Sequence, residues 1–276
     1  MHLIDGRAVA KRIRESVRER ISTEHLTPGL GVVLVGTDPA SHTYVERKEE
    51  ACAEVGIRFT KVVLPATTPQ PAVIEAVGRF NADPAIHAIL VQLPLPAPID
   101  EDAVIRAIDP RKDVDGFHPR NVRAFVDGDA ALTPVLVKAL WTLLEETRES
   151  LTKKTAAILS NAEVFARPIV AHLGRHGITA AYVAPGPNAR QRTVTADICI
   201  VALGQPKSIT NADVKRGAIV LDVGTTKIGT QWVGDVDADA VKDKASWLTP
   251  VPGGVGPVTV AQLLDNTATL AHQQST

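Results

Sequence analysis

A tyrosine and a lysine lie four residues apart in SHTYVERKEEACAEVG, residues 41–56, a segment with the pattern of a helix. Ser41 suits the N-cap position, and Tyr44 and Lys48 would then share one helix face. Desolvation lowers the pKa of a lysine, and a lysine that loses its proton near neutral pH can act as a general base. The alternative is a solvent-facing lysine whose stem covers a half-buried tyrosine.

A glutamine ends the apolar run of ILVQLPLP, residues 89–96. Pro94 and Pro96 stop this strand because proline cannot donate to a β-ladder. Ligands in open α/β sheets bind outside the carboxyl ends of the strands, so the amide of Gln92 could orient a substrate or a lysine there. The alternative is an ordinary polar residue at a strand end.

Three aspartates crowd the turn-rich stretch DPRKDVDGFHP, at Asp109, Asp113 and Asp115. Their spacing does not match a calcium loop, so we expect one to face a pocket while the others cap turns. His172 and His176 stand at i and i+4 on an expected helix, but no third ligand accompanies them. The sequence therefore predicts no metal site.

The elements that must position these residues are short apolar strands that alternate with helical patterns. Strands that are apolar throughout are typical of sheets covered on both faces. The expected strands are 30–35, 59–64, 87–92, 155–159, 179–184, 197–203 and 218–223. The expected helices are an N-terminal helix, 41–55, 69–81, 100–107, 134–149, 164–176 and 258–271. This alternation predicts an α/β fold built from βαβ units with parallel sheets.

Two irregular segments suggest how the chain is divided. Residues 108–130 are polar and rich in aspartate, and TPVPGGVGP, residues 249–257, is rich in proline and glycine. We expect an N-terminal α/β lobe with the catalytic residues, a Rossmann-like lobe with a parallel sheet, and a C-terminal loop and helix that return to the first lobe. The expected bounds are 1–118, 119–250 and 251–276.

Composition and charge exclude several classes of protein. The formal net charge of −1 argues against a nucleic-acid binder. Cys52 and Cys199 lie in apolar surroundings and are expected to be buried thiols. The N-terminus lacks the apolar core of a signal peptide, and no window reaches the roughly 18 apolar residues that span a bilayer. We expect a soluble cytoplasmic protein that binds neither a membrane nor a nucleic acid.

Four long segments carry a resemblance that spans nearly the whole chain. They are SHTYVERKEEACAEVGI, ILVQLPLP, IDPRKDVDGFHPRN and TPVPGGVGPVTVAQLLDNT. In sequence, order and spacing they closely resemble the methylenetetrahydrofolate dehydrogenase/methenyltetrahydrofolate cyclohydrolase family, the FolD type. The resemblance implies a tetrahydrofolate derivative as substrate, a Rossmann NAD(P) lobe, and a homodimer formed through that lobe.

The resemblance also assigns roles to residues. Lys48 matches the catalytic lysine that works on the one-carbon bridge, and Tyr44 matches the tyrosine that stacks near the pterin and positions this lysine. Gln92 matches the glutamine that tunes the lysine, and Asp115 matches the aspartate that hydrogen-bonds the pterin ring. The loop that closes over the folate corresponds to Pro252, Gly253 and Gly254.

The expected nucleotide loop departs from the family pattern. The family's loop resembles Gly-Arg-Ser-x-x-Val-Gly-x-Pro, whereas residues 160–168 read SNAEVFARP. Ser160 and Glu163 have the spacing of a capping box, which would satisfy the amides that a pyrophosphate would otherwise bind. Glu163 also places a negative charge where the helix dipole favours a phosphate. The sequence therefore predicts weak or no dehydrogenase activity.

A dinucleotide that did bind would meet an altered set of residues. Residues 184–187, which follow the second strand of the Rossmann lobe, contain no cation. The first cations after them are Arg190 and Arg192. Other nearby segments remain similar to the family. The candidate cofactor-binding residues are Ser160, Asn161, Ala162, Arg190, Gly204 and Thr259.

Four functions remain open at this stage. The first is cyclohydrolase-type chemistry at Lys48 with little dehydrogenase activity. The second is the full NADP-dependent bifunctional enzyme, with a phosphate site rebuilt around Arg190 or Arg192. The third is transfer of a one-carbon unit from methylenetetrahydrofolate to another acceptor. The fourth is a non-catalytic folate-binding protein, which the joint presence of Tyr44, Lys48, Gln92 and Asp115 disfavours.

Overall fold

The chain forms two compact units in the computed structural model, which describes residues 1–275. Unit 1 comprises Met1–Val9 and Leu136–Thr259, and unit 2 comprises Ala10–Val135 and the chain from Val260 onward. Two long helices, α1 (Gly6–Thr23) and α10 (Val255–Ser275), contribute residues to both units. The domain bounds expected from the sequence, after residues 118 and 250, stay predictions.

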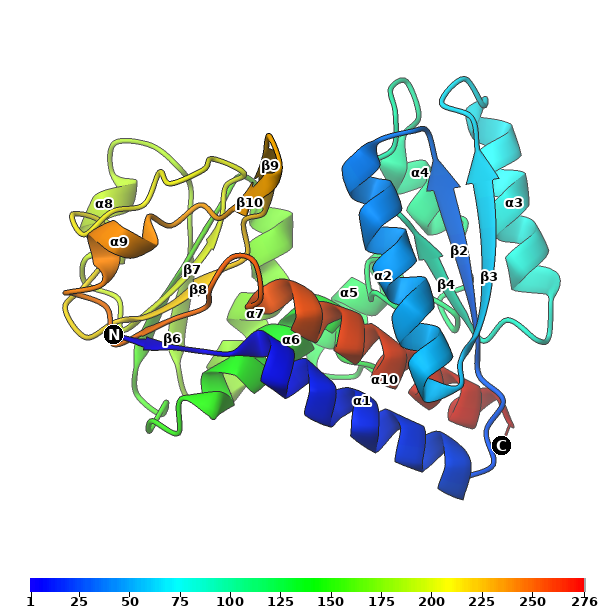
Figure 1. Ribbon diagram of the computed structural model, residues 1–276, viewed down its shortest axis with the longest axis horizontal. Helices are drawn as coiled ribbons and strands as arrows, with labels where there is room; N and C mark the ends of the chain where they lie inside the picture. The colour runs from blue at the N-terminus through cyan, green and yellow to red at the C-terminus, as the bar shows by residue number, and fades with distance from the viewer. Residues whose placement is uncertain (276) are drawn as a thin grey trace. The chain divides into compact units, whose positions relative to one another are not determined.

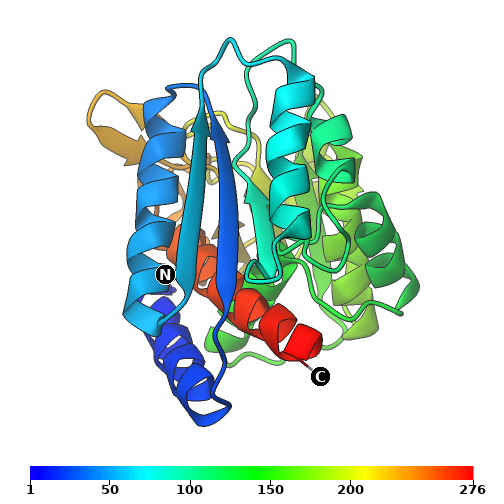
Figure 2. The same cartoon turned by 90° about the vertical axis from the view of Figure 1, so that its right-hand side faces the viewer.

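Unit 2 is built on a three-stranded parallel sheet. Its central strand is β2 (Gly29–Val35), which pairs with β3 (Arg58–Leu64) on one side and with β4 (Ala88–Val91) on the other (Figure 2). Helices α2 and α3 lie on opposite sides of this sheet (Figure 1). The helices of the unit, besides parts of α1 and α10, are α2 (Pro39–Val55), α3 (Gln70–Ala82), α4 (Glu101–Arg106) and α5 (Pro119–Asp127).

The two faces of β2 are buried in different hydrophobic cores, because successive side chains of a strand point to opposite faces. Leu30, Val32 and Leu34 pack in a core with residues of α1, α2 and α10. Val33 and Val35 pack in a second core with residues of α3 and α4. The C-terminal helix thus contributes to the core of the unit that holds β2, which confirms the expected return of this helix to the first lobe.

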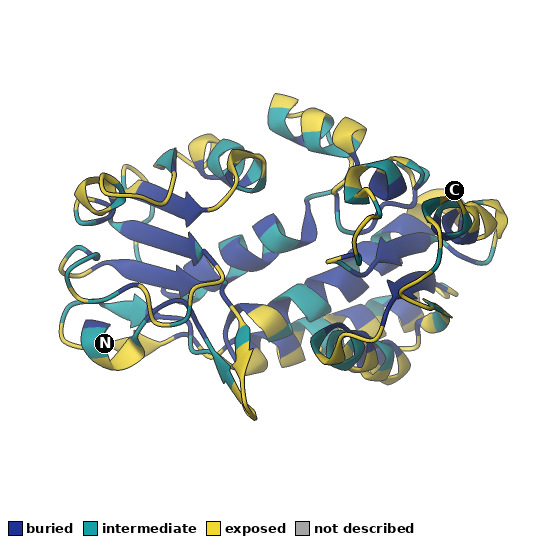
Figure 3. Cartoon of the chain, turned by 90° about the horizontal axis from the view of Figure 1, so that it is seen from above, coloured by how far each residue is buried: buried dark blue, intermediate teal, exposed yellow. Residues whose placement is uncertain are grey.

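Unit 1 is built on a six-stranded sheet in which every pairing is parallel, in the order β1-β11-β8-β7-β5-β6. The inner strands are dark blue in Figure 3 because they are buried on both faces. The strands are β1 (His2–Leu3), β5 (Thr155–Ser160), β6 (Thr179–Val183), β7 (Ile198–Ala202), β8 (Ile219–Asp222) and β11 (Trp247–Leu248). Its helices are α6 (Val135–Glu146), α7 (Glu163–Arg175), α8 (Ala189–Thr193) and α9 (Ala238–Val241).

The expected α/β class with parallel sheets is confirmed, and each of the seven expected strands is present within one residue of its expected ends. The sequence did not predict the short strands β1 and β11 or the hairpin of β9 (Thr226–Ile228) and β10 (Gln231–Val233). It also missed α5, although Val122, Phe125 and Val126 have a helical spacing, because the segment is short and was interpreted as part of a polar inter-domain passage. Cys52 and Cys199 are free and buried, as expected.

No helix within residues 1–275 is both long enough and apolar enough to cross a membrane.

A buried lysine closes the C-terminal end of α3. The ammonium of Lys112 donates to the carbonyl oxygens of Phe80, Asn81 and Asp83, at 3.2, 2.9 and 2.8 Å. A cation is favourable there because the last carbonyls of a helix carry partial negative charge and lack partners within the helix. Burial lowers the pKa of Lys112, and the nearby aspartates Asp109 and Asp83 oppose that shift.

Replacing Lys112 with methionine is expected to destabilise the protein by about 2 kcal/mol, because three buried or partly buried carbonyl groups lose their donor while the apolar stem is retained. The urea midpoint of unfolding measures this change. Arg111→Met is the matched control, since the side chain of Arg111 is exposed and forms a surface ion pair with Asp109. Equal midpoints for the two variants would contradict the proposed role of the buried ammonium.

Candidate active site

Helix α2 carries Tyr44 and Lys48, and it begins earlier than the sequence suggested. The N-cap is Asp38, whose carboxylate accepts the backbone N–H of Ser41 at 2.7 Å. Ser41 is therefore within the first turn, and its expected role as the N-cap was wrong. Proline at the first helical position explains the shift, because its fixed φ favours the start of a helix and it has no N–H to satisfy.

Lys48 and Gln92 are in direct contact. The ammonium of Lys48 donates to Oε1 of Gln92 at 2.8 Å, and Nε2 of Gln92 donates to the carbonyl oxygen of Leu93 at 2.7 Å. The second bond fixes the amide so that its oxygen faces the lysine. Gln92 is buried directly after β4, and Lys48 is half-buried on α2. Two residues that are 44 positions apart in sequence are thus brought together by the packing of α2 against the sheet.

The charge of Asp115 acts on the same lysine. Burial lowers the pKa of Lys48, and the negative charge of Asp115 opposes this shift. Burial raises the pKa of Asp115 to about 6, while Lys48 lowers it and Asp113 raises it further. The three groups form a coupled set in which the lysine is more easily deprotonated than a lysine in water.

Asp113 shapes the turn that presents Asp115. Its buried carboxylate accepts the backbone N–H groups of residues 116–118 at 2.9 to 3.2 Å and the side-chain amide of Asn121 at 2.9 Å. Asp109 is similarly engaged with the backbone N–H of Arg111 at 2.9 Å. The expectation that two of the three aspartates cap turns is met by this geometry. The contribution of Asn121 was missed, because it depends on a helix that the sequence did not reveal.

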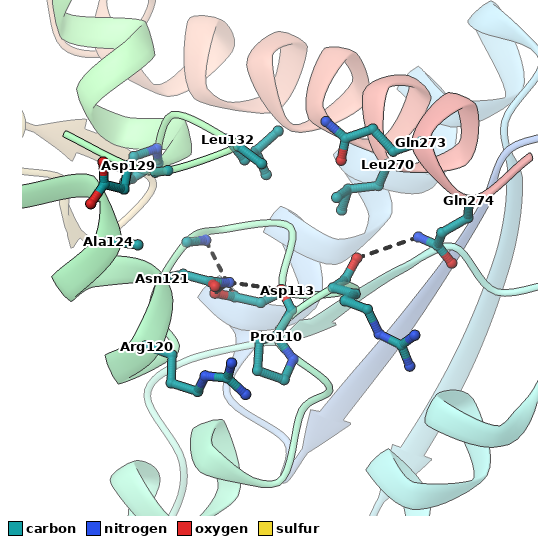
Figure 4. A pocket seen from close by; sticks show the side chains of 15 residues that line it. Pro110, Asp113, Arg120, Asn121, Ala124, Asp129, Leu132, Leu270, Gln273 and Gln274 are labelled. Atoms are coloured by element: carbon teal, nitrogen blue, oxygen red, sulfur yellow. Dashed lines mark hydrogen bonds between the residues drawn. The ribbon is translucent and has the colours of Figure 1, made fainter. Parts of the chain in front are cut away.

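A pocket of about 430 Å³ lies in unit 2, between α5, the loop after it and the end of α10 (Figure 4). Its polar lining includes Asp113, Arg120, Asn121 and Asp129. The residues that line it do not include Lys48, Gln92 or Asp115. The pocket is therefore separate from the lysine site.

The loop of Pro252, Gly253 and Gly254 belongs to unit 1, whereas Tyr44, Lys48, Gln92 and Asp115 belong to unit 2. Gly253 has a φ of 111°, which favours glycine. A Cβ atom on Gly254 would lie 2.6 Å from Cβ of Thr249 and 2.7 Å from the carbonyl oxygen of Pro250. Tight packing thus requires glycine in this loop.

The capping box expected from Ser160 and Glu163 was wrong. Ser160 is the last residue of β5, where it pairs with Ala202, and its hydroxyl donates to the carbonyl oxygen of Ala162 at 3.1 Å. The N-cap of α7 is instead Ala162, which has an extended backbone and provides no side-chain cap. The first amides of α7 are therefore not satisfied by a capping side chain, and they fit an anionic group such as a pyrophosphate. Glu163 does stand in the first turn, as expected.

The other candidate cofactor residues also lie in unit 1. Asn161 donates from Nδ2 to the carbonyl oxygen of Leu203 at 2.7 Å, and the N–H of Gly204 donates to Asp235 at 3.0 Å. The guanidinium of Arg190 is exposed, and its Nε donates to the carbonyl oxygen of Ala212 at 2.8 Å. Thr259, the last candidate, lies on α10, and its hydroxyl donates to a backbone carbonyl oxygen one turn earlier.

The paired histidines of α7 pack against an indole of α6. The rings of His176 and His172 have centroids 4.0 and 5.3 Å from that of Trp141. Burial lowers the pKa of His172 to about 4, and the neighbouring His176 adds to the shift. No group of three or more potential metal ligands is found among residues 1–275.

Comparison with known proteins assigns both halves of the chain to one family. Residues 4–115 match the family described as "Tetrahydrofolate dehydrogenase/cyclohydrolase, catalytic domain". Residues 134–275 match the family described as "Tetrahydrofolate dehydrogenase/cyclohydrolase, NAD(P)-binding domain". The chain belongs to the tetrahydrofolate dehydrogenase/cyclohydrolase family.

Individual members of the family are similar along their full length. A bifunctional FolD protein from Moorella thermoacetica is 42% identical over 276 residues, which cover 98% of this chain and 99% of the relative. The crystal structure of a bifunctional FolD enzyme from Campylobacter jejuni superposes with a TM-score of 0.93 at 37% identity, covering 99% of both chains. A Trypanosoma brucei FolD structure, solved with NADP and an inhibitor, has a TM-score of 0.93 at 36% identity and covers 99% of this chain and 98% of its own.

Membership in this family changes the interpretation of the nucleotide loop. The match to the NAD(P)-binding domain runs through residues 160–168 without the expected glycines. The capping box on which we based weak dehydrogenase activity is absent from the structure. The expectation that NAD(P) binding is doubtful is therefore not supported, and the chain is an enzyme of the FolD type with an NAD(P)-binding domain.

Replacing Asp115 with asparagine should lower the pKa of Lys48 further, because the carboxylate stabilises the ammonium form in the native protein. The titration of Lys48 can be followed directly by NMR of lysine labelled at Cε. Asp129→Asn is the control, because Asp129 is exposed and lies outside the lysine site. A Lys48 titration that moves to higher pH in the Asp115 variant would contradict the assigned coupling.

Proposed function

We propose that this protein is a bifunctional methylenetetrahydrofolate dehydrogenase/methenyltetrahydrofolate cyclohydrolase that uses NADP. The contact between Lys48 and Gln92 carries the proposal, because it places a lysine of lowered pKa at the carboxyl end of β4. The match to both family domains and the names of the full-length relatives support the combination of two activities.

In the cyclohydrolase reaction, we assign Lys48 as the group that takes a proton. Water adds to the methenyl carbon of methenyltetrahydrofolate, a C–O bond forms, and one of the two C–N bonds of that carbon breaks to give formyltetrahydrofolate. One proton of the water passes to neutral Lys48 as the C–O bond forms, and the remaining hydroxyl proton passes to the nitrogen of the broken C–N bond as the formyl C=O forms. Burial favours the neutral form that can accept it, and the hydrogen bond to Gln92 keeps the amine aimed at one place.

Three further groups are assigned to substrate binding. Asp115, whose charge is coupled to that of Lys48, would accept hydrogen bonds from the amino-pyrimidine edge of the pterin. Tyr44, one helical turn before Lys48, would stack near the pterin and position the lysine. The loop that would close over the folate consists of Pro252, Gly253 and Gly254.

In the dehydrogenase reaction, bound NADP would accept a hydride from the methylene carbon. The residues of unit 1 fit such a cofactor, because the first amides of α7 are not capped by a side chain. Arg190 and Arg192 follow β6, the region where arginine receives the 2′-phosphate in Rossmann folds. These cations support NADP as the cofactor.

Two assays on the purified protein test the proposal. Loss of the methenyltetrahydrofolate chromophore should accelerate, and methylenetetrahydrofolate with NADP⁺ should give reduced nicotinamide. Hydrolysis without reduction of either NAD⁺ or NADP⁺ would leave a monofunctional cyclohydrolase and overturn the dehydrogenase half. Absence of both activities, with folate binding retained, would indicate a folate-binding protein.

Homodimer formation stays a prediction, which light scattering after size exclusion can check.

A further inference from the structure

The strand order of unit 1 defines where a ligand should bind. Strand β6 lies on one side of β5, and the chain then crosses to β7 on the other side. Doubly wound sheets bind ligands at this point of reversal, outside the carboxyl ends of the two strands. Here the loop after β5, residues 160–162, and the turn after β7, residues 203–205, flank that point.

One buried aspartate fixes the turn after β7. Asp235 is fully buried, and its Oδ2 accepts the backbone N–H groups of Leu203 and Gly204 at 2.6 and 3.0 Å. Its Oδ1 accepts the N–H of Gln205 at 2.7 Å. Three consecutive amides are thus bound by one side chain from a segment 30 residues later in the sequence. No other type of side chain of this size offers two acceptor atoms to three donors.

A second buried aspartate fixes the first. Asp222, at the end of β8, accepts the backbone N–H groups of Asp235 at 3.1 Å and of Val236 at 2.9 Å. It also accepts the N–H of Gly224 at 3.0 Å. The backbone that carries Asp235 is therefore fixed by a residue at the end of a sheet strand, and the carboxylate of Asp235 in turn fixes the turn after β7.

The loop after β5 is tied to the same turn by a side-chain amide. Asn161 donates from Nδ2 to the carbonyl oxygen of Leu203 at 2.7 Å, across the point of reversal. Ala162 follows as the N-cap of α7. The start of α7 is thus connected through Asn161 and Leu203 to Asp235, and its position does not depend on a glycine-rich loop.

We propose that Asp235 and Asn161 are positioning residues of the dinucleotide site in this chain. Asp235 fixes the turn of residues 203–205, and Asn161 fixes the amides of α7 relative to that turn, so that both edges of the site are preorganised for the pyrophosphate. This inference rests on the proposed dehydrogenase function. It specifies how a loop without glycines can receive NAD(P).

Calorimetric titration with NADP⁺ and NAD⁺ tests this proposal on the full chain. Asn161→Ala should raise the Kd for NADP⁺ about tenfold, the effect of losing one hydrogen bond, here the bond to the carbonyl oxygen of Leu203 that fixes the start of α7. Asp235→Asn should raise the Kd at least as much, because its amide NH₂ would face backbone donors. The KM for NADP⁺ should rise more than kcat falls, since neither residue touches the reacting atoms.

The matched controls are Asn211→Ala and Asp239→Asn. They make the same two substitutions at exposed residues of unit 1. They should leave the Kd unchanged. Asn161→Ala removes an exposed side chain and should fold like the wild type, so it keeps the test decisive if Asp235→Asn unfolds. Wild-type binding of NADP⁺ with an unchanged Kd in Asn161→Ala would overturn the positioning role alone. A wild-type protein that binds no dinucleotide would overturn the proposed dehydrogenase function and this inference with it.

Discussion

Replacing Lys48 with methionine should slow the hydrolysis of methenyltetrahydrofolate by about 1000-fold, within the range that a positioned acid or base contributes to a reaction. Methionine keeps an unbranched apolar chain in a half-buried position but cannot accept a proton. It also removes the donor to Oε1 of Gln92. The initial rate of chromophore loss, compared with the uncatalysed rate in the same buffer, measures the effect.

The matched control for this variant is Lys61→Met. Lys61 lies on β3 of the same unit, and its ammonium forms an ion pair with Glu49 of α2 at 2.6 Å, near the surface. Its replacement should leave the rate within about twofold, because an exposed pair contributes little. NADP⁺ should bind the Lys48 variant with unchanged affinity, since the residues of the expected dinucleotide site belong to the other unit. Hydrolysis at the wild-type rate in Lys48→Met would remove this residue from the mechanism.

The elements of this fold were predictable where burial dictates residue type. Strands covered on both faces must be apolar throughout, and β2, β5, β7 and β8 have that character in the sequence. The pairing of Lys48 with Gln92 was predictable for a related reason. Lys48 shares a helix face with Tyr44 and Gln92 follows the end of a strand, and the family resemblance linked the two residues.

The nucleotide loop shows where local pattern fails. Ser160 and Glu163 have the spacing of a capping box, but Ser160 is held in β5 by its pairing with Ala202. The helix can therefore start only after the strand has ended, and its N-cap is Ala162. The spacing of two residues shows which capping hydrogen bonds are possible. Strand pairing then determines whether the first of those residues is available to form them.

The aspartates of unit 1 could not be assigned from sequence for a different reason. Asp235 binds amides 30 to 32 residues away, and Asp222 binds amides 13 and 14 residues away. The spacing of Asp235 from its partners belongs to no helix, turn or hairpin, whereas Asp222 and the amides of residues 235 and 236 flank the hairpin of β9 and β10. The parallel order of β7 and β8 and the return of the chain through this hairpin together bring these groups to one edge of the sheet. The nearest sequence signal is the pair of glycines beside them, Gly224 and Gly234, which leave room for the two carboxyl groups.

Gly234→Ala should therefore be among the most destabilising single substitutions in unit 1, at about 3 kcal/mol, because it combines overpacking with a broken buried hydrogen bond. A Cβ atom at this position would overlap Oδ2 of Asp222 and lie 2.8 Å from Cγ2 of Val251. The carboxyl group can move only by giving up the N–H of Val236, which it accepts at 2.9 Å in a buried turn. The urea midpoint of unfolding and the Kd for NADP⁺ should both report the change.

Gly174→Ala is the control, and it should have the opposite sign. Gly174 is exposed within α7, and a Cβ atom there would meet nothing within 4 Å. Alanine in such a position should stabilise the helix by up to about 1 kcal/mol, because glycine loses more backbone entropy on folding. A Gly234 variant as stable as the wild type would mean that the carboxyl group of Asp222 can leave its position without cost. The turn that holds Asp235, and through it the expected dinucleotide site, would then not be rigidly fixed.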